Sequence, residues 1–498
     1  MSATVIHDLL DAAAAAHPGR PAIGDGTDSM TYSAVRLASL RLATWLLGQG
    51  VRGRERIVVS EAAGPWLAPL LIGAARIGAV SVPLSAGAPP VVVRHILTDA
   101  EPALVIGDGA TIGEAARSGI VHRGLDEMRA AARTGPHDAG MPSRTLPVDP
   151  AWFIYTSGST GAPKAVVSTH AQVVFAARAA HRELGYIRDD VVYSPLPLSF
   201  DYGLYQILLA TLGGARLELG SAKDAGRALL GRLCETGATV FPAVPSLAST
   251  LARLVERPGA RAPVLRLLTN TGAAMPADVL ATLRKHIPGL KVQLMYGLTE
   301  CKRATIMPPD GDLLRPGSSG RALHGTEVFA VDQRGERLPP GDVGEIVVRG
   351  PNVMSGYWRR PQLTTERFRR VDGLFPQLHT GDYGSVDAEG YLYFDGRRDD
   401  VYKERGTRVS SLEVEAAANR IPHVRDACAV PPRAPAHGAT LVVASELTPG
   451  QVLAALTGHL EETKIPRRCL TLPALPLTAN GKIDRLRLTR LVEETSDA

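Results

Sequence analysis

The sequence predicts an α/β protein with a large N-terminal domain, built of doubly wound sheets and a small β-barrel, and a smaller α+β domain at the C-terminus. First, short apolar runs such as RIVVS, AVSVPL and ALVIGD alternate with helix-length segments, a pattern typical of parallel strands joined by crossover helices. Second, the pattern changes from about residue 327 to short strands separated by glycine-containing turns. Third, 498 residues exceed what one hydrophobic core usually supports, so at least two domains are expected.

The expected elements follow this alternation along the chain. HDLLDAAAAAH is amphipathic, and a second helix follows Thr31. Residues 118–150 are rich in Arg, Gly and Pro and are expected to form a connector. After them the strands WFIYTS, VVYSPLPL and ARLELG alternate with helices that begin near His170, after Asp201 and over residues 229–236.

The last part of the chain predicts two further units. VFAVDQRGERLPPGDVGEIVVRG indicates a small antiparallel barrel or sheet. After GRRDDVYKERG the sequence has helices of its own, SLEVEAAANRI and QVLAALTGHLEETK, and strands of its own, ACAVPP and TLVVASE. These are enough for a separate domain of ordinary size, so we expect one domain over residues 1–398 and another over residues 399–498.

Composition favours a soluble globular protein, with 45% hydrophobic and 21% charged residues. The net charge is +5 and the pI is near 9.0, but basic and acidic residues are interleaved, so no nucleic-acid partner is expected, although an acidic macromolecular partner remains open. The longest apolar stretch is interrupted by Arg76 and prolines, and the N-terminus lacks a signal-peptide pattern, so we expect a cytoplasmic protein without a membrane partner. The four cysteines show neither metal-ligand spacing nor a disulfide framework.

A run of hydroxyl and glycine residues, TSGSTGAPK, stands between a buried strand and a helix. The amides and hydroxyls of such a turn form a concavity for anionic oxygen, and Lys164 adds a point charge. Pro163 and Ala165 replace residues that the usual NTPase phosphate loop requires. A flexible surface loop is the alternative, but such loops rarely separate a buried strand from a helix, so the run predicts a phosphate site. Its expected contacts are Thr156, Ser157, Gly158, Ser159, Thr160, Gly161 and Lys164.

YTSGSTGAPKAVVSTH resembles the phosphate loop of the adenylate-forming superfamily, which includes acyl-CoA synthetases, amino-acid adenylation enzymes and luciferases. TGAAMP, YGLTE, HTGDYG, GRRDDVYKERGTRVSSLEVE and PLTANGKIDR occur in the family's order and at familiar spacing. The resemblance covers essentially the whole chain. One departure is Ala165, where a glycine usually follows the lysine. The resemblance implies that the protein joins a carboxylate to the α-phosphate of ATP and releases pyrophosphate.

The resemblance assigns three residues to the chemistry. Glu300 matches the ligand of Mg²⁺, a hard cation that takes carboxylate and phosphate oxygens. Thr299 matches a hydrogen-bond donor to phosphate, and Lys482 matches the lysine that reaches the reacting carboxylate and the α-phosphate. Alone, Glu300 would pass for a surface glutamate and Lys482 for a solvated lysine after Asn-Gly, but the companion motifs favour the catalytic roles.

Further contacts are implied by the same resemblance. Tyr296 offers a flat face to adenine, and the small residues of TGAAMP permit close approach of the backbone. Asp382 and Arg397 match the ribose contacts, although a turn aspartate is the simpler explanation of Asp382 alone. Asp399 matches a hinge about which the C-terminal domain moves, and Gly406 matches a glycine that lines the tunnel for a phosphopantetheine thiol. The expected nucleotide contacts outside the phosphate loop are Gly272, Ala273, Ala274, Tyr296, Asp382 and Arg397.

SPLPLSFDYGLYQILLATL carries the information about the acid. Amino-acid adenylation enzymes of the family place an aspartate after the position of Phe200, and it pairs with the substrate ammonium. Here that residue is Asp201, and a buried carboxylate is costly unless a cation meets it. Alternatively, Asp201 caps the following helix. FDYG, with Arg303 shortly after YGLTE, resembles the stand-alone β-amino-acid adenylation enzymes of macrolactam assembly, although some fatty-acyl ligases also have FDYG.

Arg303 has two interpretations. It contacts a second carboxylate on the substrate, or it forms a structural ion pair with Glu183 or another acid. The resemblance places further residues near the pocket, and their polar character does not suit a long alkyl chain. These residues are Phe200, Tyr202, Tyr205, Thr269, Thr271 and Met295.

Three functions remain open from the sequence. The first is adenylation of an amino acid, with a β-amino acid favoured, using ATP and Mg²⁺, followed by transfer to the thiol of a separate acyl carrier protein in secondary metabolite biosynthesis. The second keeps the chemistry and uses CoA as acceptor, as an acyl- or aryl-CoA ligase. The third is a nucleotide-binding protein without catalysis, which the presence of Lys482, Glu300 and Asp382 disfavours.

Overall fold

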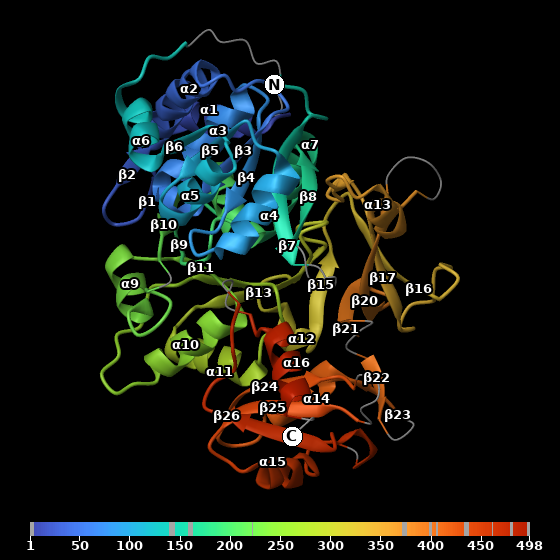
Figure 1. The fold of residues 1–498 in the computed structure, drawn as a ribbon. Helices are drawn as coiled ribbons and strands as arrows, with labels where there is room; N and C mark the ends of the chain where they lie inside the picture. The colour runs from blue at the N-terminus through green and yellow to red at the C-terminus, as the bar shows by residue number, and fades with distance from the viewer. Residues whose placement is uncertain are drawn as a thin grey trace. The chain divides into compact units, whose positions relative to one another are not determined.

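The computed structural model describes residues 4–138, 145–157, 163–221, 223–370, 376–397, 401–404, 407–432, 438–460, 462–478 and 482–495. The chain divides into two compact units. The first unit is Met1–Val328 with Val348–His379, and the second is Phe329–Val347 with Thr380–Ala498 (Figure 1). The predicted boundary between residues 398 and 399 falls outside the described residues, so it stays a prediction, as does the mobility of the C-terminal domain.

One sheet of the first unit carries the phosphate hairpin. Its central strands are parallel, and its last pairs, β7 with β8 and β8 with β18, are antiparallel. The strand order is β18 (Gly356–Tyr357), β8 (Pro163–Thr169), β7 (Pro150–Ser157), β4 (Val80–Leu84), β3 (Arg56–Ser60), β5 (Leu104–Gly107) and β6 (His122–Gly124).

Helices cover both faces of this sheet, as a doubly wound arrangement requires. On one face, Val58 and Val105 pack with residues of two helices, α4 (Pro90–Ala100) and α5 (Gly109–Arg117). On the other face, Ile57 and Ile106 belong to the cluster formed with α2 (Tyr32–Gly48), α3 (Leu67–Arg76) and α6 (Leu125–Thr134). The prediction of a doubly wound fold is therefore confirmed (Figure 1).

The second sheet of this unit is parallel from β1 through β13 and antiparallel at both ends. Its order is β2 (Ser29–Thr31), β1 (Pro21–Gly24), β10 (Arg216–Leu219), β9 (Val191–Ser194), β11 (Val240–Ala243), β12 (Leu267–Asn270), β13 (Lys291–Tyr296), β14 (Thr305–Ile306) and β15 (Ser318–Ala322). The helices of this part are α1 (Ile6–Ala16), α7 (His170–Leu184), α8 (Asp201–Gly213), α9 (Leu229–Thr236), α10 (Pro245–Val255) and α11 (Ala277–His286). Smaller elements of the unit are a 3-10 helix (Glu61–Trp66), α12 (Gly311–Leu314), α13 (Pro361–Arg367) and β19 (Phe368–Arg369).

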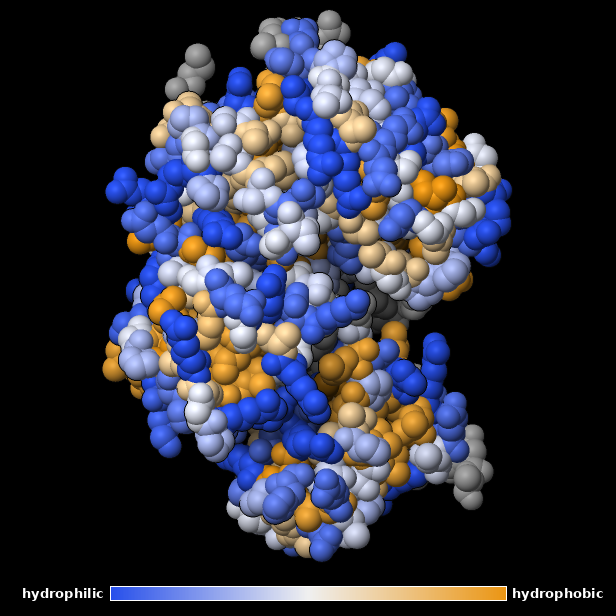
Figure 2. All heavy atoms as spheres, turned by 90° about the vertical axis from the view of Figure 1, so that its left-hand side faces the viewer, coloured by the Kyte–Doolittle hydropathy of each residue, from blue (hydrophilic) through white to orange (hydrophobic). Residues whose placement is uncertain are grey.

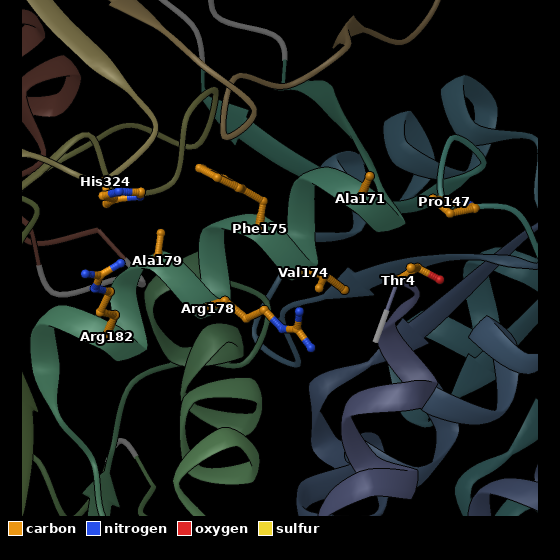
Figure 3. A pocket seen from close by; sticks show the side chains of 9 residues that line it. All are labelled: Thr4, Pro147, Ala171, Val174, Phe175, Arg178, Ala179, Arg182 and His324. Carbon is orange, nitrogen blue, oxygen red and sulfur yellow. The ribbon is translucent and has the colours of Figure 1, made fainter. Parts of the chain in front are cut away.

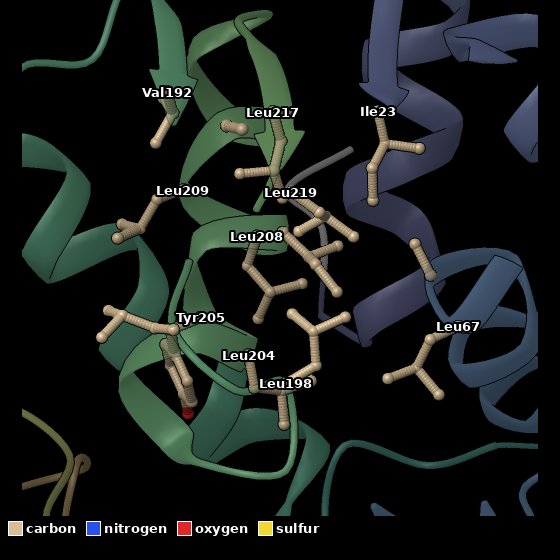
Figure 4. Packing of buried hydrophobic residues seen from close by; sticks show 14 of the residues in the cluster. Ile23, Leu67, Val192, Leu198, Leu204, Tyr205, Leu208, Leu209, Leu217 and Leu219 are labelled. Carbon is tan, nitrogen blue, oxygen red and sulfur yellow. The ribbon is translucent and has the colours of Figure 1, made fainter. Parts of the chain in front are cut away.

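Helix α8 is buried on nearly all sides, which holds its first turn in place. Figure 4 shows Leu204, Leu208 and Leu209 of α8 packed among side chains that include Val192 and Leu217 of the neighbouring strands. Gly203 lies against the preceding loop so closely that a Cβ there would be 2.3 Å from the carbonyl oxygen of Pro197. The helix therefore has little room to shift, and Asp201 at its start is held rigidly.

The second unit contains most of the short strands predicted from residue 327 onward, although β16, β17 and β20 each have two or three residues in the first unit. A C-terminal α+β part follows these strands. The short strands occur in the order β16 (Glu327–Val331), β17 (Gly344–Arg349), β20 (Gln377–Val386) and β21 (Tyr391–Arg397). The C-terminal part contains the hairpin β22 (Val401–Glu404) and β23 (Thr407–Ser410), and the sheet β24 (Val424–Val430), β25 (Thr440–Ser445) and β26 (Arg468–Leu472). Its helices are α14 (Ser411–Ala418), α15 (Pro449–Leu456), a 3-10 turn (Glu462–Lys464) and α16 (Arg485–Glu494).

Two details differ from expectation. Residues 118–150 were expected to be a connector but contain β6 and α6, because Leu125, Met128 and Ala132 form an apolar stripe that packs into the core. The apolar run VVYSPLPL forms strand only over Val191–Ser194, since the prolines that follow cannot continue a ladder.

On the face of the molecule in Figure 2, hydrophilic and hydrophobic side chains are interspersed. Within the described ranges, no helix is both long enough and apolar enough to cross a membrane.

Candidate functional site

The phosphate run lies on the hairpin of β7 and β8. Thr156 and Lys164 are partners in the antiparallel register, so they lie opposite each other on the two strands. Ser157 is the last residue of β7, and Gly158, Ser159, Thr160 and Gly161 lie outside the described residues. Ala165, where the family usually has glycine, lies within β8 and is fully buried in an apolar cluster. Its methyl group therefore packs into the core of the sheet.

Glu300 is tied to a tyrosine that the sequence motifs did not include. The Tyr357 hydroxyl donates a hydrogen bond to Glu300 Oε1 at 2.7 Å, and the ring centroid of Tyr357 lies 4.0 Å from Lys164 Nζ. Burial, together with the nearby Glu300 charge, raises the pKa of Tyr357, which keeps the phenol protonated as a donor. The candidate metal ligand and the phosphate lysine therefore share one neighbour.

The donor set fits a magnesium ion that binds together with phosphate. Glu300 is half-buried, and the Tyr357 hydrogen bond is to Oε1 and not to Oε2. The part of the chain that the structure describes contains no cluster of three or more His, Cys, Asp or Glu side chains suited to a metal. Mg²⁺ is usually held by one or two carboxylates with substrate phosphates and water, and Glu300 meets that requirement.

The expected adenine segment follows the ends of two neighbouring parallel strands. Thr271 follows β12, and Tyr296 ends β13, which pairs with β12 in parallel. The carboxyl ends of parallel strands meet at one edge of a sheet, where ligands bind in such folds. Gly272 has a φ of 96°, a value that favours glycine, and Ala273 and Ala274 are exposed beside it. Thr299 lies in the turn after Tyr296 and is half-buried.

Asp201 and Arg303 meet in the candidate acid pocket. Arg303 Nη1 lies 4.0 Å from Asp201 Oδ2, and the guanidinium lies 4.7 Å from the ring centroid of Tyr202. The ion-pair interpretation of Arg303 named Glu183 or another acid as its partner. The acid beside Arg303 is Asp201, whereas Glu183 accepts a hydrogen bond from Gln293 through its main-chain oxygen. A carboxylate and a guanidinium thus lie in contact range at the position predicted for the acid.

Asp201 is not the N-cap of α8, which was the alternative explanation of this residue. The N-cap of α8 is Phe200, and Asp201 is the first helical residue. Within α8, whose residues are all described, no backbone amide donates to the Asp201 carboxylate. The carboxylate is 4% exposed at the first turn, where the helix dipole favours a negative charge. Capping therefore does not account for this buried carboxylate, and its charged neighbour is Arg303.

Lys302 is a site residue that the sequence reasoning missed. It is 1% exposed, and its Nζ has no hydrogen-bond partner among the described residues. The ammonium lies 5.6 Å from the ring centroid of Tyr205, whose buried hydroxyl likewise has no partner within the described ranges. Burial lowers the pKa of Lys302, and the charges of Asp201 and Glu300 oppose this effect. The sequence signal for Lys302 was the segment CKRAT, in which two adjacent cationic residues are flanked by residues of apolar or small type.

The other predicted pocket residues lie on α8, β12 and β13 or directly beside their ends. Tyr202 donates to the main-chain oxygen of Thr269 at 2.8 Å and lies 2.7 Å from its hydroxyl. Tyr205 packs edge-on against Trp152, with ring centroids 5.7 Å apart, and its position in α8 is visible in Figure 4. Thr271 and Met295 are buried at the ends of β12 and β13, and Phe200 is half-buried at the start of α8.

The profile of the AMP-binding enzyme family matches residues 10–358, and the profile of the C-terminal domain of AMP-binding enzymes matches residues 413–482. The chain belongs to the AMP-binding enzyme family. Its adenylation chemistry uses ATP, so the predicted superfamily, the enzymatic character and the nucleotide are confirmed.

Two relatives of this AMP-binding enzyme carry the names of different kinds of ligase. L-proline–[L-prolyl-carrier protein] ligase of Streptomyces coelicolor is 32% identical over 95% of this chain and 94% of its own. Feruloyl-CoA synthase of an Amycolatopsis species is 31% identical over 94% of both chains. The curated relatives thus act on carboxylic acids and use a carrier-protein or a CoA thiol.

Two further comparisons concern secondary metabolism and structure. CymA of Salinispora arenicola, whose name describes a nonribosomal peptide synthetase, is 33% identical over 97% of this chain, which spans 6% of that relative's length. The structure of VinN in complex with L-aspartate is 40% identical, with a TM-score of 0.72, and covers 79% of this chain and 98% of its own.

In the second unit of the AMP-binding enzyme, the two predicted ribose contacts are partners in one ladder. Asp382 of β20 lies opposite Arg397 of β21 in the antiparallel register, and Asp382 is 3% exposed. The main-chain oxygen of Lys482 accepts a hydrogen bond from the amide of Thr478 at 2.7 Å, and the next residue, Ile483, forms a bridge with Leu477. The side chain of Arg397, and the whole of Asp399 and Gly406, lie outside what the structure describes, so their roles stay predictions.

A separate cavity of about 420 Å³ lies beside α7 of the AMP-binding enzyme, and Figure 3 shows its lining. The residues that line it are Thr4, Pro147, Ala171, Val174, Phe175, Arg178, Ala179, Arg182 and His324. None of the described residues predicted for the nucleotide or the acid is among them, so this cavity is not assigned to the reaction.

Proposed function

We propose that this AMP-binding enzyme adenylates an amino acid with ATP and Mg²⁺ and transfers the acyl group to the phosphopantetheine thiol of a separate carrier protein. A β-amino acid is favoured, and its side chain carries a second carboxylate. The observation that supports this substrate is the group of three buried charges formed by Asp201, Lys302 and Arg303.

The charges of this group match an amino dicarboxylate. Asp201 would take the substrate ammonium, which meets the requirement that a buried carboxylate be paired with a cation. Two cations, Lys302 and Arg303, are then left for an anion. An unsubstituted acid leaves all of the pocket charges without a ligand partner, and a monocarboxylic amino acid leaves the two cations without one. A second carboxylate, separate from the one that is activated, meets both cations.

The comparisons support the same class of substrate. VinN was solved with L-aspartate, and the proline relative is named as a carrier-protein ligase. The alternative, a CoA ligase, is supported by the similarity to feruloyl-CoA synthase. A feruloyl group has no amine, and the buried Asp201 and Lys302 favour a charged substrate over a phenolic one.

The chain's residues divide the work of the first step between them. Lys164 and the hydroxyls at Thr156 and Ser157 would contact the phosphates of ATP, and Glu300 would hold the magnesium ion. The bound ion would neutralise charge on the phosphates as the carboxylate approaches. Lys482 would donate to the oxygens of the carboxylate and the α-phosphate, where negative charge increases in the transition state.

ATP–pyrophosphate exchange over a panel of acids tests the substrate. We expect exchange with aspartate, glutamate or their β-amino isomers, and much less with alanine, β-alanine, ferulate or octanoate. Exchange supported only by acids without an amino group would contradict the amino-acid proposal. Exchange with β-alanine as strong as with the acidic amino acids would contradict the second carboxylate.

Mass measurement of the acceptor tests the transfer step. The protein, ATP and the acid found in the panel are mixed with CoA in one arm and with phosphopantetheinylated carrier proteins in the other. We expect the mass of a carrier to increase by the acyl group. Acyl-CoA as the product, with all carriers unmodified, would favour the CoA ligase alternative.

A further inference from the structure

Tyr357 contacts two charged groups on which the nucleotide site depends. Its hydroxyl donates to Glu300 Oε1 at 2.7 Å, and Lys164 Nζ lies 4.0 Å from its ring centroid. One side chain therefore touches the carboxylate expected to bind the metal and the lysine expected to bind phosphate. Tyr357 itself is buried, with 6% of its surface exposed.

The backbone around Tyr357 links the same two parts of the site. We name residues 352–358 the tie segment. Tyr357 pairs with Val166 of the phosphate hairpin, and the amide of Trp358 donates to Ala165 at 3.0 Å. The amide of Met354 donates to the main-chain oxygen of Glu300 at 2.8 Å. The tie segment therefore bonds to β8 and to the turn that carries Glu300.

Further contacts fix both the backbone and the ring of Tyr357. Its amide donates to Thr364 Oγ1 at 3.0 Å, and the ring packs edge-on against Phe368 with centroids 5.5 Å apart. A side chain held this firmly transmits its orientation to its hydrogen-bond partner. Hydrogen-bonded partners of metal-ligating carboxylates orient those ligands and contribute to metal affinity.

We propose that Tyr357 is a positioning residue of the nucleotide site: its hydroxyl orients Glu300 for the divalent cation, and its ring holds Lys164 at the base of the phosphate hairpin. This inference rests on the proposed function, because it assumes that Glu300 and Lys164 bind a metal–nucleotide complex. The hydroxyl and the ring have separate roles that two substitutions can distinguish.

Tyr357→Phe removes the hydroxyl and keeps the ring over Lys164, whereas Tyr357→Leu removes both. The readout is binding of Mn²⁺ to the protein with α,β-methylene-ATP, measured from the electron paramagnetic resonance signal of unbound Mn²⁺. We expect Y357F to weaken Mn²⁺ binding by about tenfold or more and to leave metal-free nucleotide binding unchanged. Y357L should also weaken metal-free nucleotide binding, by roughly two- to fivefold.

Tyr32→Phe is the matched control, because the buried Tyr32 hydroxyl donates to the main-chain oxygens of Ala210 and Ala215. It should lower the melting temperature without changing Mn²⁺ affinity. In a Glu300→Gln background, Y357F should change Mn²⁺ affinity by less than about twofold, since the two residues act through one contact. A Y357F protein with wild-type Mn²⁺ affinity, or an undiminished effect in the Glu300→Gln background, would overturn the positioning role.

Pyrophosphate exchange by the wild-type protein separates the two proposals. If the wild type supports exchange with an amino acid and Y357F binds Mn²⁺ normally, the positioning role is wrong and the proposed function stands. If Y357F loses Mn²⁺ affinity and the wild type supports exchange with no amino acid, the proposed function is wrong and the positioning role stands.

Discussion

At the residue scale, a buried ammonium with no hydrogen-bond partner in the described structure is an unfavourable feature. Burial of an unpaired polar or charged group costs free energy, so a stable fold does not retain one without a compensating use. Lys302 is such a group, and the charges of Asp201 and Arg303 act on it. A ligand carboxylate would supply the missing partner.

Lys302→Met should therefore stabilise the unliganded protein and damage its function. Methionine has a similar volume and no charge, so we expect the free energy of unfolding at pH 7 to rise by about 1–3 kcal/mol. Exchange with the acidic amino acid should fall by roughly 10–100-fold, because a hydrogen bond to a charged group is lost. Chemical denaturation and exchange kinetics check both effects, with the exposed Lys285→Met as control. A destabilised variant with normal exchange would contradict this role.

The same lysine predicts a pH dependence. Its pKa in the folded protein is lowered from the ordinary value of 10.5, so between the two values the unfolded chain binds more protons than the folded chain. The free energy of unfolding of the wild type therefore rises with pH across that interval, relative to the Lys302→Met variant. Denaturation at a series of pH values up to about 10 checks this. A difference that stays constant, or widens in favour of the variant, would contradict the prediction.

Asp201→Asn tests recognition of the amine with little change in volume. We expect exchange with amino acids to fall by roughly 100-fold, since an ion pair to the ammonium is replaced by a neutral contact. Asp278→Asn is a matched control, because Asp278 also lies in the first turn of a helix, α11, but is exposed. The control accounts for the helix-dipole contribution. Equal losses in both variants would refute the substrate role of Asp201.

At the element scale, the position of α8 depends on a glycine. A Cβ at Gly203 would lie 2.3 Å from the oxygen of Pro197 and 2.9 Å from that of Leu196. Gly203→Ala should displace the helix and lower the free energy of unfolding by about 1–3 kcal/mol, and it should also weaken amino-acid binding. Gly231→Ala in α9 is the control, since the nearest atom to its added Cβ is Glu235 Oε1 at 3.9 Å. There alanine should stabilise by about 0.5–1 kcal/mol, as thermal unfolding of both variants would show.

The elements with strong periodicity were predictable from the sequence. The starts of α7 and α8, at His170 and Asp201, and the whole of α9 agree with the prediction, because each has a capping residue or an apolar repeat that does not depend on distant contacts. Helix α6 was missed, because arginine and glycine around it outweighed its short apolar stripe. Its helical state depends on packing into the core, which a local pattern does not show.

The site residues were predictable to the extent that they occur in contiguous motifs. Glu300 and Lys164 are read from YGLTE and from the phosphate run. Tyr357 was not predictable, because its contacts to them join segments more than fifty residues apart and arise only from the pairing of β18 with β8. Lys302 was not predictable for a related reason, since burial of a lysine follows from tertiary packing and not from its neighbours in sequence.

At the scale of the whole molecule, the residues expected to act together come from two units. Lys164, Glu300 and Asp201 belong to the first unit, and Asp382 and Lys482 to the second. Within the second unit, the segment after Lys482 is anchored by Arg485, whose Nη2 lies 2.7 and 2.9 Å from the two carboxylate oxygens of Glu415. The residues that follow Lys482 are therefore attached to α14.

Lys482→Ala should separate the two half-reactions. We expect pyrophosphate exchange to fall by roughly 10²–10³, as for other lost donors to transition-state charge. Transfer from a chemically prepared acyl-adenylate to the thiol acceptor should change little, because the resemblance assigns Lys482 to the first step. Lys464→Ala in the same unit is the control, since Lys464 forms an ion pair with Glu413 at 2.8 Å. Loss of both half-reactions to the same extent would contradict this division.

Asn352 gives the acid pocket a property that has practical value. Its Nδ2 donates to the main-chain oxygens of Cys301 and Arg303, at 3.2 and 3.0 Å. These bonds support the path of the chain on both sides of Lys302, and neither involves the side chains at positions 302 and 303. Selectivity for the acid is thus open to redesign by exchanging those two side chains on an unchanged main chain. Under the proposed carrier-loading function, the scaffold is a suitable starting point for enzymes that use unnatural building blocks.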